Sequence, residues 1–492
     1  MEENRKPHKS LKQKTVSGMI WSAFQRYSTM FITFISGIIL ARLLTPHDYG
    51  CIGMLSIFMV LAECFIDGGF GEALIQKKNP TQADYSTIFY WNIGMAVLMY
   101  IILYVSAPAI ATFYKIPLLC DVLRVQGVVL FIYAFNIVQR NQLRKRMNFK
   151  VLSVVTIITS ITSLTITIIM AYHGYGVWSL VVQNIVTGLI PALVFWFYIK
   201  WRPQITFSRK SLQELFSFGL YMFLTHVLNR FERQIQGLLI GKVYDSATMG
   251  YYSKAHSVER LSSTSISQVM SQVAFPLYAE LQEDKGKLQS ALKRLSMTLS
   301  YFTFPMMFIL LLCAKPFFII LYSDRWVASV PYFQVLCIAG LAYCLQSVNN
   351  QTIAAIGKSK VMFYYTVLKR VIGISLIVFG LILFGMKGLL VGVVLNTWVS
   401  YFINICVVSK YIGYKWWIQL LDIMPVFVMS SLAAAISFGV GSVISANLYV
   451  DGVIKLMVYL ILYLGWSFLF KPEAFVFAEN SILSIVNKRK KH

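Results

Sequence analysis

The chain has 492 residues, of which 57% are hydrophobic and only 13% are charged. A soluble protein of this size carries about a quarter charged residues, so the composition excludes a soluble protein and predicts a polytopic membrane protein. The net charge of +24 suggests a nucleic-acid partner at first sight. Most of the basic residues lie in loops between apolar segments, however, so we expect no nucleic acid as a partner.

Apolar segments long enough to cross a bilayer recur along the whole chain, and we interpret each as a membrane-spanning helix. The fourteen predicted helices lie near residues 18–40, 50–67, 87–108, 121–140, 151–172, 176–199, 214–241, 255–278, 296–320, 331–353, 361–384, 388–410, 420–442 and 452–470. An even number of helices places both termini on one side of the membrane. Most of the 44 Lys and Arg residues fall in the tails and alternate loops on that side, which predicts cytoplasmic termini.

The chain also contains an internal repeat. Residues 37–50 and 237–250 share a pattern in which Gly, three apolar residues, a small residue and a basic residue precede a turn that closes on Gly. Two further landmarks recur in the same order at offsets of 208 and 212 residues, namely Pro108 with Tyr114 and Pro316 with Tyr322, then Gly176 with Asn184 and Gly388 with Asn396. Three landmarks in one order indicate a duplication with small loop insertions.

The repeat predicts the domain organisation. We expect an N-lobe of residues 1–205 with six helices, a C-lobe of residues 206–412 with six more, and a last part of residues 413–492 with two helices and a basic cytoplasmic tail. The fold class is therefore an all-α polytopic membrane protein of about fourteen transmembrane helices, with two six-helix repeats around a central cavity. Because six is even, both repeats have the same orientation in the membrane.

Three basic residues interrupt the apolar segment that begins the second repeat. His226, Arg230 and Arg233 have the spacing i, i+4 and i+7, which places them on one face of a helix. At an offset of 200 residues, Arg26 of the first helix falls on His226, and Arg26 also lies on a face with several Ser and Thr residues. Cations inside a membrane segment usually face a cavity or a partner, so these four residues are candidates for a cationic, substrate-binding cavity. The alternative is that Arg26 reaches the headgroups and that the hydroxyl groups only join helices.

Two acids lie one helical turn apart at the end of the second predicted helix. Glu63 and Asp67 are candidates for coupling transport to protons or Na⁺, because a buried carboxylate can titrate. The alternative is that they pair with Arg26 or Arg42, or lie at the membrane interface. No nucleotide-binding motif and no Cys or His cluster with metal-ligand spacing occurs, so the sequence predicts neither a cofactor nor a metal site.

Three strings of the sequence, ARLLTPHDYGCIGM, FIDGGFGEALIQKKNPTQADYSTIFYWN and GYYSKAHSVERL, resemble the bacterial polysaccharide exporters. These are flippases of the O-antigen and colanic-acid type in the multidrug/oligosaccharidyl-lipid/polysaccharide superfamily. The resemblance implies a transporter in the bacterial cytoplasmic membrane that alternately exposes a central cavity to either side. It implies as cargo an oligosaccharide repeat unit on a polyprenyl diphosphate, with membrane lipids, a polysaccharide polymerase and glycosyltransferases as partners.

Rival functions share this fold or this pathway. A cation-coupled multidrug exporter of the same superfamily would need an acidic cavity, and it usually has only twelve helices. A peptidoglycan-precursor flippase would differ only in its cargo. A polysaccharide polymerase or ligase, which is an enzyme, normally carries a large extracytoplasmic loop, whereas the loops predicted here are short. The sequence therefore favours a transporter over an enzyme.

Overall fold

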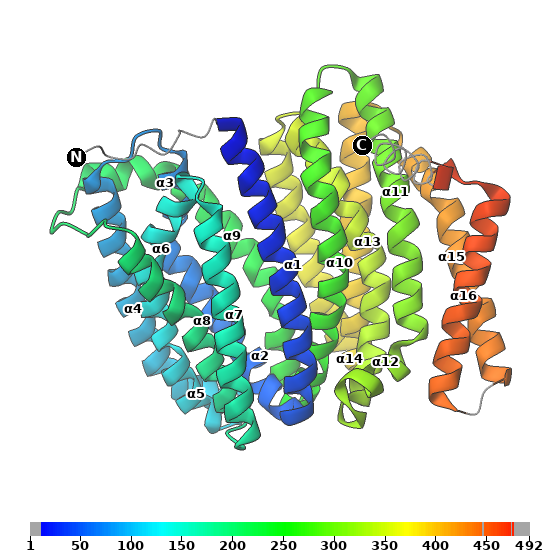
Figure 1. The fold of residues 1–492 in the computed structure, drawn as a ribbon, viewed down its shortest axis with the longest axis horizontal. Coiled ribbons are helices and arrows are strands. Elements are labelled where there is room, and N and C mark those ends of the chain that lie inside the picture. Colours follow the sequence, from blue (N-terminus) through cyan, green and yellow to red (C-terminus); the bar gives the residue numbers. More distant parts are fainter. Residues whose placement is uncertain (1–10, 445–446, 474, 477–492) are drawn as a thin grey trace, which may run out of the picture. The chain divides into compact units, whose positions relative to one another are not determined.

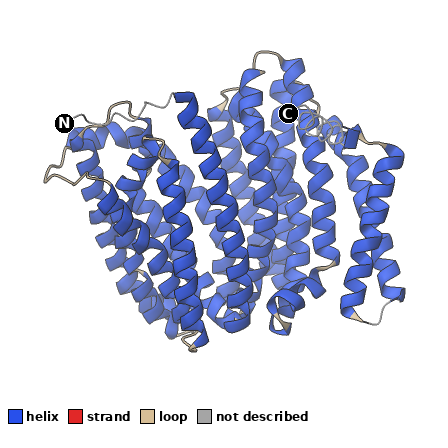
Figure 2. Cartoon of the chain, viewed as in Figure 1, coloured by secondary structure: helices blue, strands red, loops and turns tan. Residues whose placement is uncertain are grey.

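A computed structural model describes residues 11–444, 447–473 and 475–476 of the chain. These residues are almost entirely helical and contain no strand (Figure 2), which confirms the predicted all-α class. The elements in chain order are α1 (Leu11–Leu43), α2 (Pro46–Asp67), α3 (Phe70–Gln76), α4 (Gln82–Tyr114), α5 (Leu118–Gln126), α6 (Val128–Lys145), α7 (Phe149–Tyr172), α8 (Val177–Tyr198), α9 (Arg209–Val243), α10 (Ser246–Glu280), α11 (Lys285–Leu312), α12 (Ala314–Tyr322), the 3-10 helix η1 (Asp324–Ser329), α13 (Val330–Ala355), α14 (Ser359–Ile412), α15 (Trp416–Ile444) and α16 (Leu448–Phe470).

Each of the fourteen predicted spans lies on helix in the structure (Figure 1). The predicted helices at 361–384 and 388–410 form the two arms of α14, which is broken at Gly385 by a backbone φ of 59°. The arms approach closely beside this break, because a Cβ at Gly388 would lie 2.0 Å from the carbonyl oxygen of Gly380. Only glycine permits this contact, so the sequence itself specifies the hairpin.

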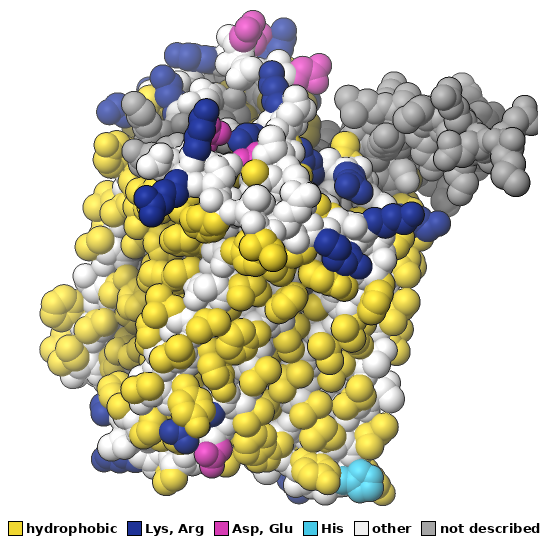
Figure 3. Space-filling model, turned by 90° about the vertical axis from the view of Figure 1, so that its left-hand side faces the viewer, with side chains coloured by type: hydrophobic (Ala, Val, Ile, Leu, Met, Phe, Trp, Pro, Cys, Tyr) yellow, Lys and Arg dark blue, Asp and Glu magenta, His cyan; other side chains and the backbone are white. Residues whose placement is uncertain are grey.

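Ten helical segments of the described residues are long and apolar enough to cross a membrane. The segment Val361–Ile412 is one of the ten and contains both arms of α14, and the count is compatible with about fourteen spans. The long helices α1, α9 and α10 are not among them, because they carry more polar residues. Figure 3 shows a face on which hydrophobic side chains cover the middle while Lys and Arg gather toward both ends. The chain is a multi-pass membrane protein.

The helices form two compact units, residues 1–250 and residues 251–492. In unit 1, α7 packs on α1 and α8, and α2 packs on α4, α6 and α9. In unit 2, α13 packs on α11 and α14, and α15 packs on α11 and α16. The helix α9 was predicted to begin the C-lobe, yet it packs on α2, α3 and α4 inside unit 1. The predicted lobe limits at 205 and 412 stay predictions.

A pair of glycines fixes α9 against the end of α2. Gly68 and Gly69 both have positive φ, 55° and 75°, and they end α2 and turn the chain into the short α3. A Cβ at Gly69 would lie 2.2 Å from the carbonyl oxygen of Gly219 on α9. The glycines therefore allow a backbone approach that brings the polar middle of α9 beside α2 and α3.

The two copies of the first repeat landmark occupy equivalent helix starts. The helices α2 and α10 begin at Pro46 and Ser246, which are 200 residues apart. Their contact is reciprocal, because a Cβ at Gly50 would lie 1.8 Å from the Ser246 carbonyl oxygen and a Cβ at Gly250 would lie 1.8 Å from that of Pro46. The helices α4 and α12 likewise end at the equivalent Tyr114 and Tyr322. Superposition of the two repeats as whole units stays a prediction.

Candidate functional site

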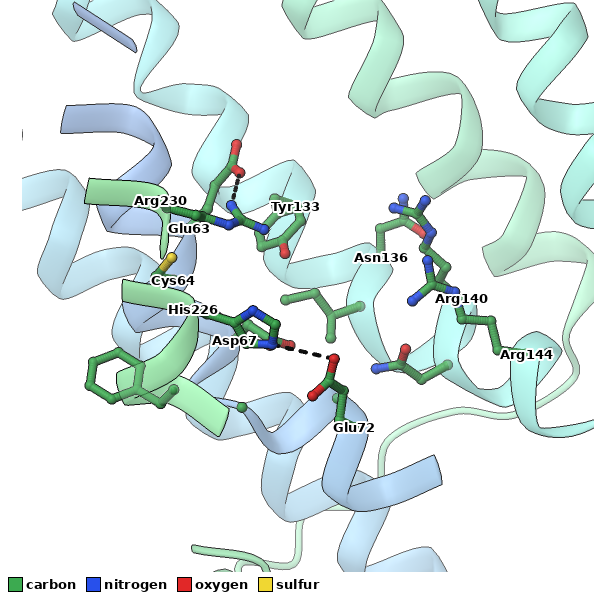
Figure 4. Close-up of a pocket in the computed structure, with 15 residues that line it drawn as sticks. Glu63, Cys64, Asp67, Glu72, Tyr133, Asn136, Arg140, Arg144, His226 and Arg230 are labelled. Carbon is green, nitrogen blue, oxygen red and sulfur yellow. Dashed lines mark hydrogen bonds and ion pairs between the residues drawn. The ribbon is translucent and has the colours of Figure 1, made fainter. Parts of the chain in front are cut away.

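A pocket of about 320 Å³ lies within unit 1 and is lined by residues of α2, α3, α6 and α9 (Figure 4). Its lining is unusually rich in charge for helices that cross a membrane. The acidic and basic residues of the lining are Glu63, Asp67, Glu72, Arg140, Arg144, His226 and Arg230. Cys64, Tyr133, Asn136 and Asn141 also contribute to the wall.

One wall of the pocket consists of acids and bases that pair with each other. Arg230 on α9 donates a hydrogen bond from Nη1 to Glu63 Oε2 on α2, at 3.2 Å. One turn earlier on α9, His226 Nε2 lies 3.3 Å from Glu72 Oε1 on α3. Both pairs are only partly buried, with side chains between 27% and 47% exposed. They are open to the pocket, so a bound ion can compete for them.

Two lysines, Lys145 of α6 and Lys77 just after α3, hold the C-terminal end of α3 in place. Lys145 of α6 donates from Nζ to the carbonyl oxygens of Leu74, at 3.1 Å, and Ile75, at 3.0 Å, which are left without partners within the helix. Lys77 follows α3 and bridges Asp84 on α4, at 2.9 Å, and Glu214 on α9, at 3.1 Å. The hydrogen bond with Asp84 raises the pKa of Lys77 above its ordinary value. These contacts hold α3 between α4, α6 and α9, and so place Glu72 in the pocket.

The opposite wall carries two arginines that form no ion pair with a described residue. Arg140 and Arg144 are one turn apart on α6, and both side chains are exposed to the pocket. Figure 4 shows the two guanidinium groups side by side, across the pocket from Glu63, Asp67 and His226. Among the residues that the structure describes, neither arginine has an ion-pair partner.

Two adjacent like charges are unfavourable unless an anion or water joins them. Guanidinium groups match the oxygens of a phosphate, because their planar fork can donate two parallel hydrogen bonds. The pair on α6 is therefore suited to a phosphate or diphosphate. The paired wall opposite can exchange an internal ion pair for a contact with the same ligand.

The structure brings together four of the six residues predicted from the sequence. His226 and Arg230 line the pocket, and so do Glu63 and Asp67. Glu63 pairs with Arg230, whereas the sequence had offered Arg26 and Arg42 as its alternatives. The predicted roles of the four lining residues, in substrate binding and in ion coupling, stay predictions.

The other two predicted residues lie outside the pocket. Arg26 is half-buried on α1, and Arg233 is exposed on α9. Arg233 shares a helix face with His226, but seven residues correspond to about 10 Å along the helix axis, which is beyond the pocket. Arg26 and Arg233 do not line this pocket, and their predicted role in a cavity stays a prediction.

Sequence reasoning missed Arg140 and Arg144, because arginines near a helix end were attributed to the charge bias of the loops. A signal was nonetheless present. Tyr133, Asn136, Arg140 and Arg144 follow one another at spacings of three, four and four, which is a polar stripe along one helix face.

The fold and the pocket define a helical multi-pass membrane protein with a pocket lined by charged side chains inside a helix bundle. The chain belongs to the polysaccharide biosynthesis protein family, whose model matches residues 39–331. This confirms the resemblance to polysaccharide exporters that the sequence strings indicated.

Individual relatives and a solved structure agree with this membership. The teichuronic acid biosynthesis protein TuaB of Bacillus subtilis is 26% identical over 72% of this chain and 74% of its own length. The succinoglycan biosynthesis transport protein ExoT of Rhizobium meliloti is 24% identical over 84% of this chain and 82% of its own. The lipid II flippase MurJ, in an inward closed conformation, has a TM-score of 0.75 with 16% identity, covering 92% of this chain and 98% of its own. The likeness to MurJ shows the fold alone.

Proposed function

We propose that this chain transports polyprenyl-diphosphate-linked oligosaccharide units across the bacterial cytoplasmic membrane for the synthesis of a surface polysaccharide. It acts as a transporter and not as an enzyme. The observation that carries the proposal is the pair Arg140 and Arg144, two exposed guanidinium groups in a helix bundle that have no carboxylate partner among the described residues. Membership of the polysaccharide biosynthesis family and the similarity to ExoT, a succinoglycan biosynthesis transport protein, support it.

The mechanism follows from the cost of moving a diphosphate through hydrocarbon. An unpaired charge in the bilayer centre is expensive, and sugar hydroxyl groups lose their water as well. In the proposed mechanism the diphosphate binds Arg140 and Arg144 while the polyprenyl chain stays in the lipid. Arg230 can turn from Glu63 toward the ligand, which strengthens binding and leaves Glu63 able to accept a proton. Transport then requires that the loaded pocket is exposed to the other side, as alternating access provides.

The carboxylates of the pocket favour one other candidate function. Glu63, Asp67 and Glu72 lie within the same chamber, and a cation-coupled multidrug exporter would use such acids to hold an organic cation. The unneutralised arginines argue against this ligand, because they repel it. A peptidoglycan-precursor flippase needs the same diphosphate chemistry, so only the exported glycan separates it from the function proposed here.

Undecaprenyl diphosphate binding by the purified chain in lipid nanodiscs tests the proposal. The double variant Arg140→Ala/Arg144→Ala should weaken binding by about 100-fold, because two charge-assisted contacts are lost, and Arg144→Lys alone should weaken it by only about threefold. When the double variant replaces the unchanged chain in its native cells, the surface polysaccharide should be lost although the variant reaches its normal level in the membrane.

Arg146→Ala is the matched control, because Arg146 is an exposed arginine just beyond the end of α6 that does not line this pocket. It should bind undecaprenyl diphosphate as the unchanged chain does. Normal binding and export by the double variant would contradict the proposal. Improved binding of ethidium, an organic cation, by that variant would instead favour the multidrug exporter.

A further inference from the structure

A second cavity, of about 690 Å³, lies inside unit 1 next to the first pocket. It is lined by residues of α1, α2, α5, α6, α7 and α8. The two cavities share Glu63, Tyr133, Asn136, Arg140 and Arg144, so they adjoin at these side chains. Its volume is within the range of roughly 300–1,000 Å³ that is usual for small-molecule sites.

Charge is confined to one end of this second cavity. Among the described residues that line it, only Glu63, Arg140 and Arg144 are charged, and all three belong to the border with the first pocket. The rest of the wall combines apolar side chains with hydroxyl and amide groups from five different helices, α1, α2, α5, α7 and α8. A ligand that fills both cavities therefore meets cations at one end and neutral polar groups at the other.

Several of these neutral polar groups have no hydrogen-bond partner among the described residues. Asn184 and Thr187 on α8 and Ser22 on α1 line the cavity, and no described residue hydrogen-bonds to their side chains. Polar groups at membrane depth require partners, so the cavity is built to hold water or a polyhydroxylated ligand.

We propose that this cavity binds the uncharged sugar next to the diphosphate of the lipid-linked substrate, while Arg140 and Arg144 hold the phosphates at its entrance. The inference rests on the proposed function and adds the place and chemistry of sugar recognition. Sugar hydroxyl groups both donate and accept, as Asn184 and Thr187 do. Phe149, Phe195 and Tyr133 offer rings for the apolar faces of the sugar. A polyprenyl tail would leave the amide and hydroxyl groups unpaired, and is the less suitable occupant.

The equivalent landmark in unit 2 has a close packing contact. Asn396 corresponds to Asn184, but its side chain packs against the other arm of α14, where a Cβ at Gly373 would lie 2.2 Å from Asn396 Oδ1. The cavity found along α14 is lined almost entirely by apolar residues between Val371 and Leu395, with Lys387 as its only charged side chain. Among the described residues, Asn184 thus lines a cavity in unit 1, whereas Asn396 packs against the other arm of α14.

The test measures how much a sugar adds to lipid binding. The purified chain in nanodiscs is titrated with undecaprenyl diphosphate and with the same lipid carrying one glucose, galactose or N-acetylglucosamine. At least one sugar should tighten binding about tenfold or more, as two or three hydrogen bonds in a desolvated site provide. Asn184→Leu and Thr187→Val should each reduce that gain by about three- to tenfold, and Thr187→Trp, which fills the cavity, should remove it. None of them should alter the affinity for the bare lipid.

Thr165→Val is the matched control, because Thr165 is exposed on α7, lies outside both cavities, and its hydroxyl already donates to the carbonyl oxygen of Ile161. It should keep the full sugar gain. The inference is overturned if no sugar adds affinity, or if the cavity variants weaken both lipids equally, as a tail-binding role would. If the sugar inference fails but Arg140→Ala/Arg144→Ala still loses binding of the bare lipid, the proposed function stands and only the place of sugar recognition is wrong. Unchanged bare-lipid binding in that double variant would show that the proposed function itself has failed.

Discussion

Arg230 and Arg144 carry the same charge and line the same pocket, yet they differ in what surrounds them. Arg230 is held by Glu63 at 3.2 Å, whereas Arg144 faces Arg140 on its own helix. Nearby opposite charges reduce the field that a ligand experiences, and nearby like charges increase it. In the proposed mechanism, Arg140 and Arg144 therefore attract the anion first, and Arg230 contributes only after it leaves Glu63.

Removing the acid should release Arg230. Glu63→Gln keeps the size of the side chain but leaves Arg230 without its carboxylate, so the pocket gains one positive charge. We expect undecaprenyl diphosphate to bind about three- to tenfold more tightly to this variant, and export to slow because the product leaves more slowly. Arg230→Gln should have the opposite effect on affinity. Titration in nanodiscs and measurement of surface polysaccharide together check both parts.

Glu214→Gln provides the control for this pair of variants. Glu214 also forms an ion pair, with Lys77 at 3.1 Å, but it does not line the pocket. Its removal should leave the affinity for the diphosphate unchanged. A Glu63→Gln variant with unaltered affinity would show that the pair with Arg230 has no influence on the ligand.

At the scale of the helix, the junction of α2, α3 and α9 decides whether the pocket exists. Gly69 has a φ of 75°, and a Cβ there would lie 2.2 Å from the Gly219 carbonyl oxygen. Gly69→Ala thus combines backbone strain with a clash between two helices. We expect the midpoint of thermal unfolding to fall by about 5 °C or more and diphosphate binding to weaken, because α9 carries both His226 and Arg230.

A second glycine separates strain from clash. Gly174 also has a positive φ, 81°, but no atom lies within 4 Å of a Cβ built on it. Gly174→Ala should therefore show only the cost of strain, about 1 kcal/mol, and should leave binding intact. Equal effects of the two substitutions would mean that the close approach of α9 to Gly69 does not organise the pocket.

The same junction explains which features the sequence could predict. Helix positions follow from local hydropathy, so each predicted span coincides with a helix. The pairing of Glu63 with Arg230 is different, because it joins residues 167 positions apart through a backbone contact that no local pattern reveals. Arg140 and Arg144 were attributed to membrane topology, since a basic helix end serves that role as well.

At the scale of the whole molecule, the orientation in the membrane decides from which side the pocket fills. The loop 199–208 lies at the same end of unit 1 as the pocket, because Gln82 at the start of α4 donates to the carbonyl oxygen of Arg202, at 2.7 Å, and α3 contacts α4. The opposite end carries the turn at 173–176, which contains no Lys or Arg, whereas the residues from 200 to 210 contain four. The charge bias therefore predicts that the pocket end is cytoplasmic.

Single cysteines introduced into a cysteine-free variant test this orientation. Ile205 is 97% exposed and Tyr175 is 57% exposed, so both positions accept a thiol-reactive label. In intact cells, a membrane-impermeant maleimide should label Tyr175→Cys and not Ile205→Cys, and after the cells are opened it should label both. Cytoplasmic loading is what a lipid-linked unit requires if it is built inside the cell and completed outside. Labelling of Ile205→Cys from outside would reverse the topology. It would also leave the Arg140–Arg144 pair facing the compartment into which the substrate should be released, and the direction of transport proposed here would be wrong.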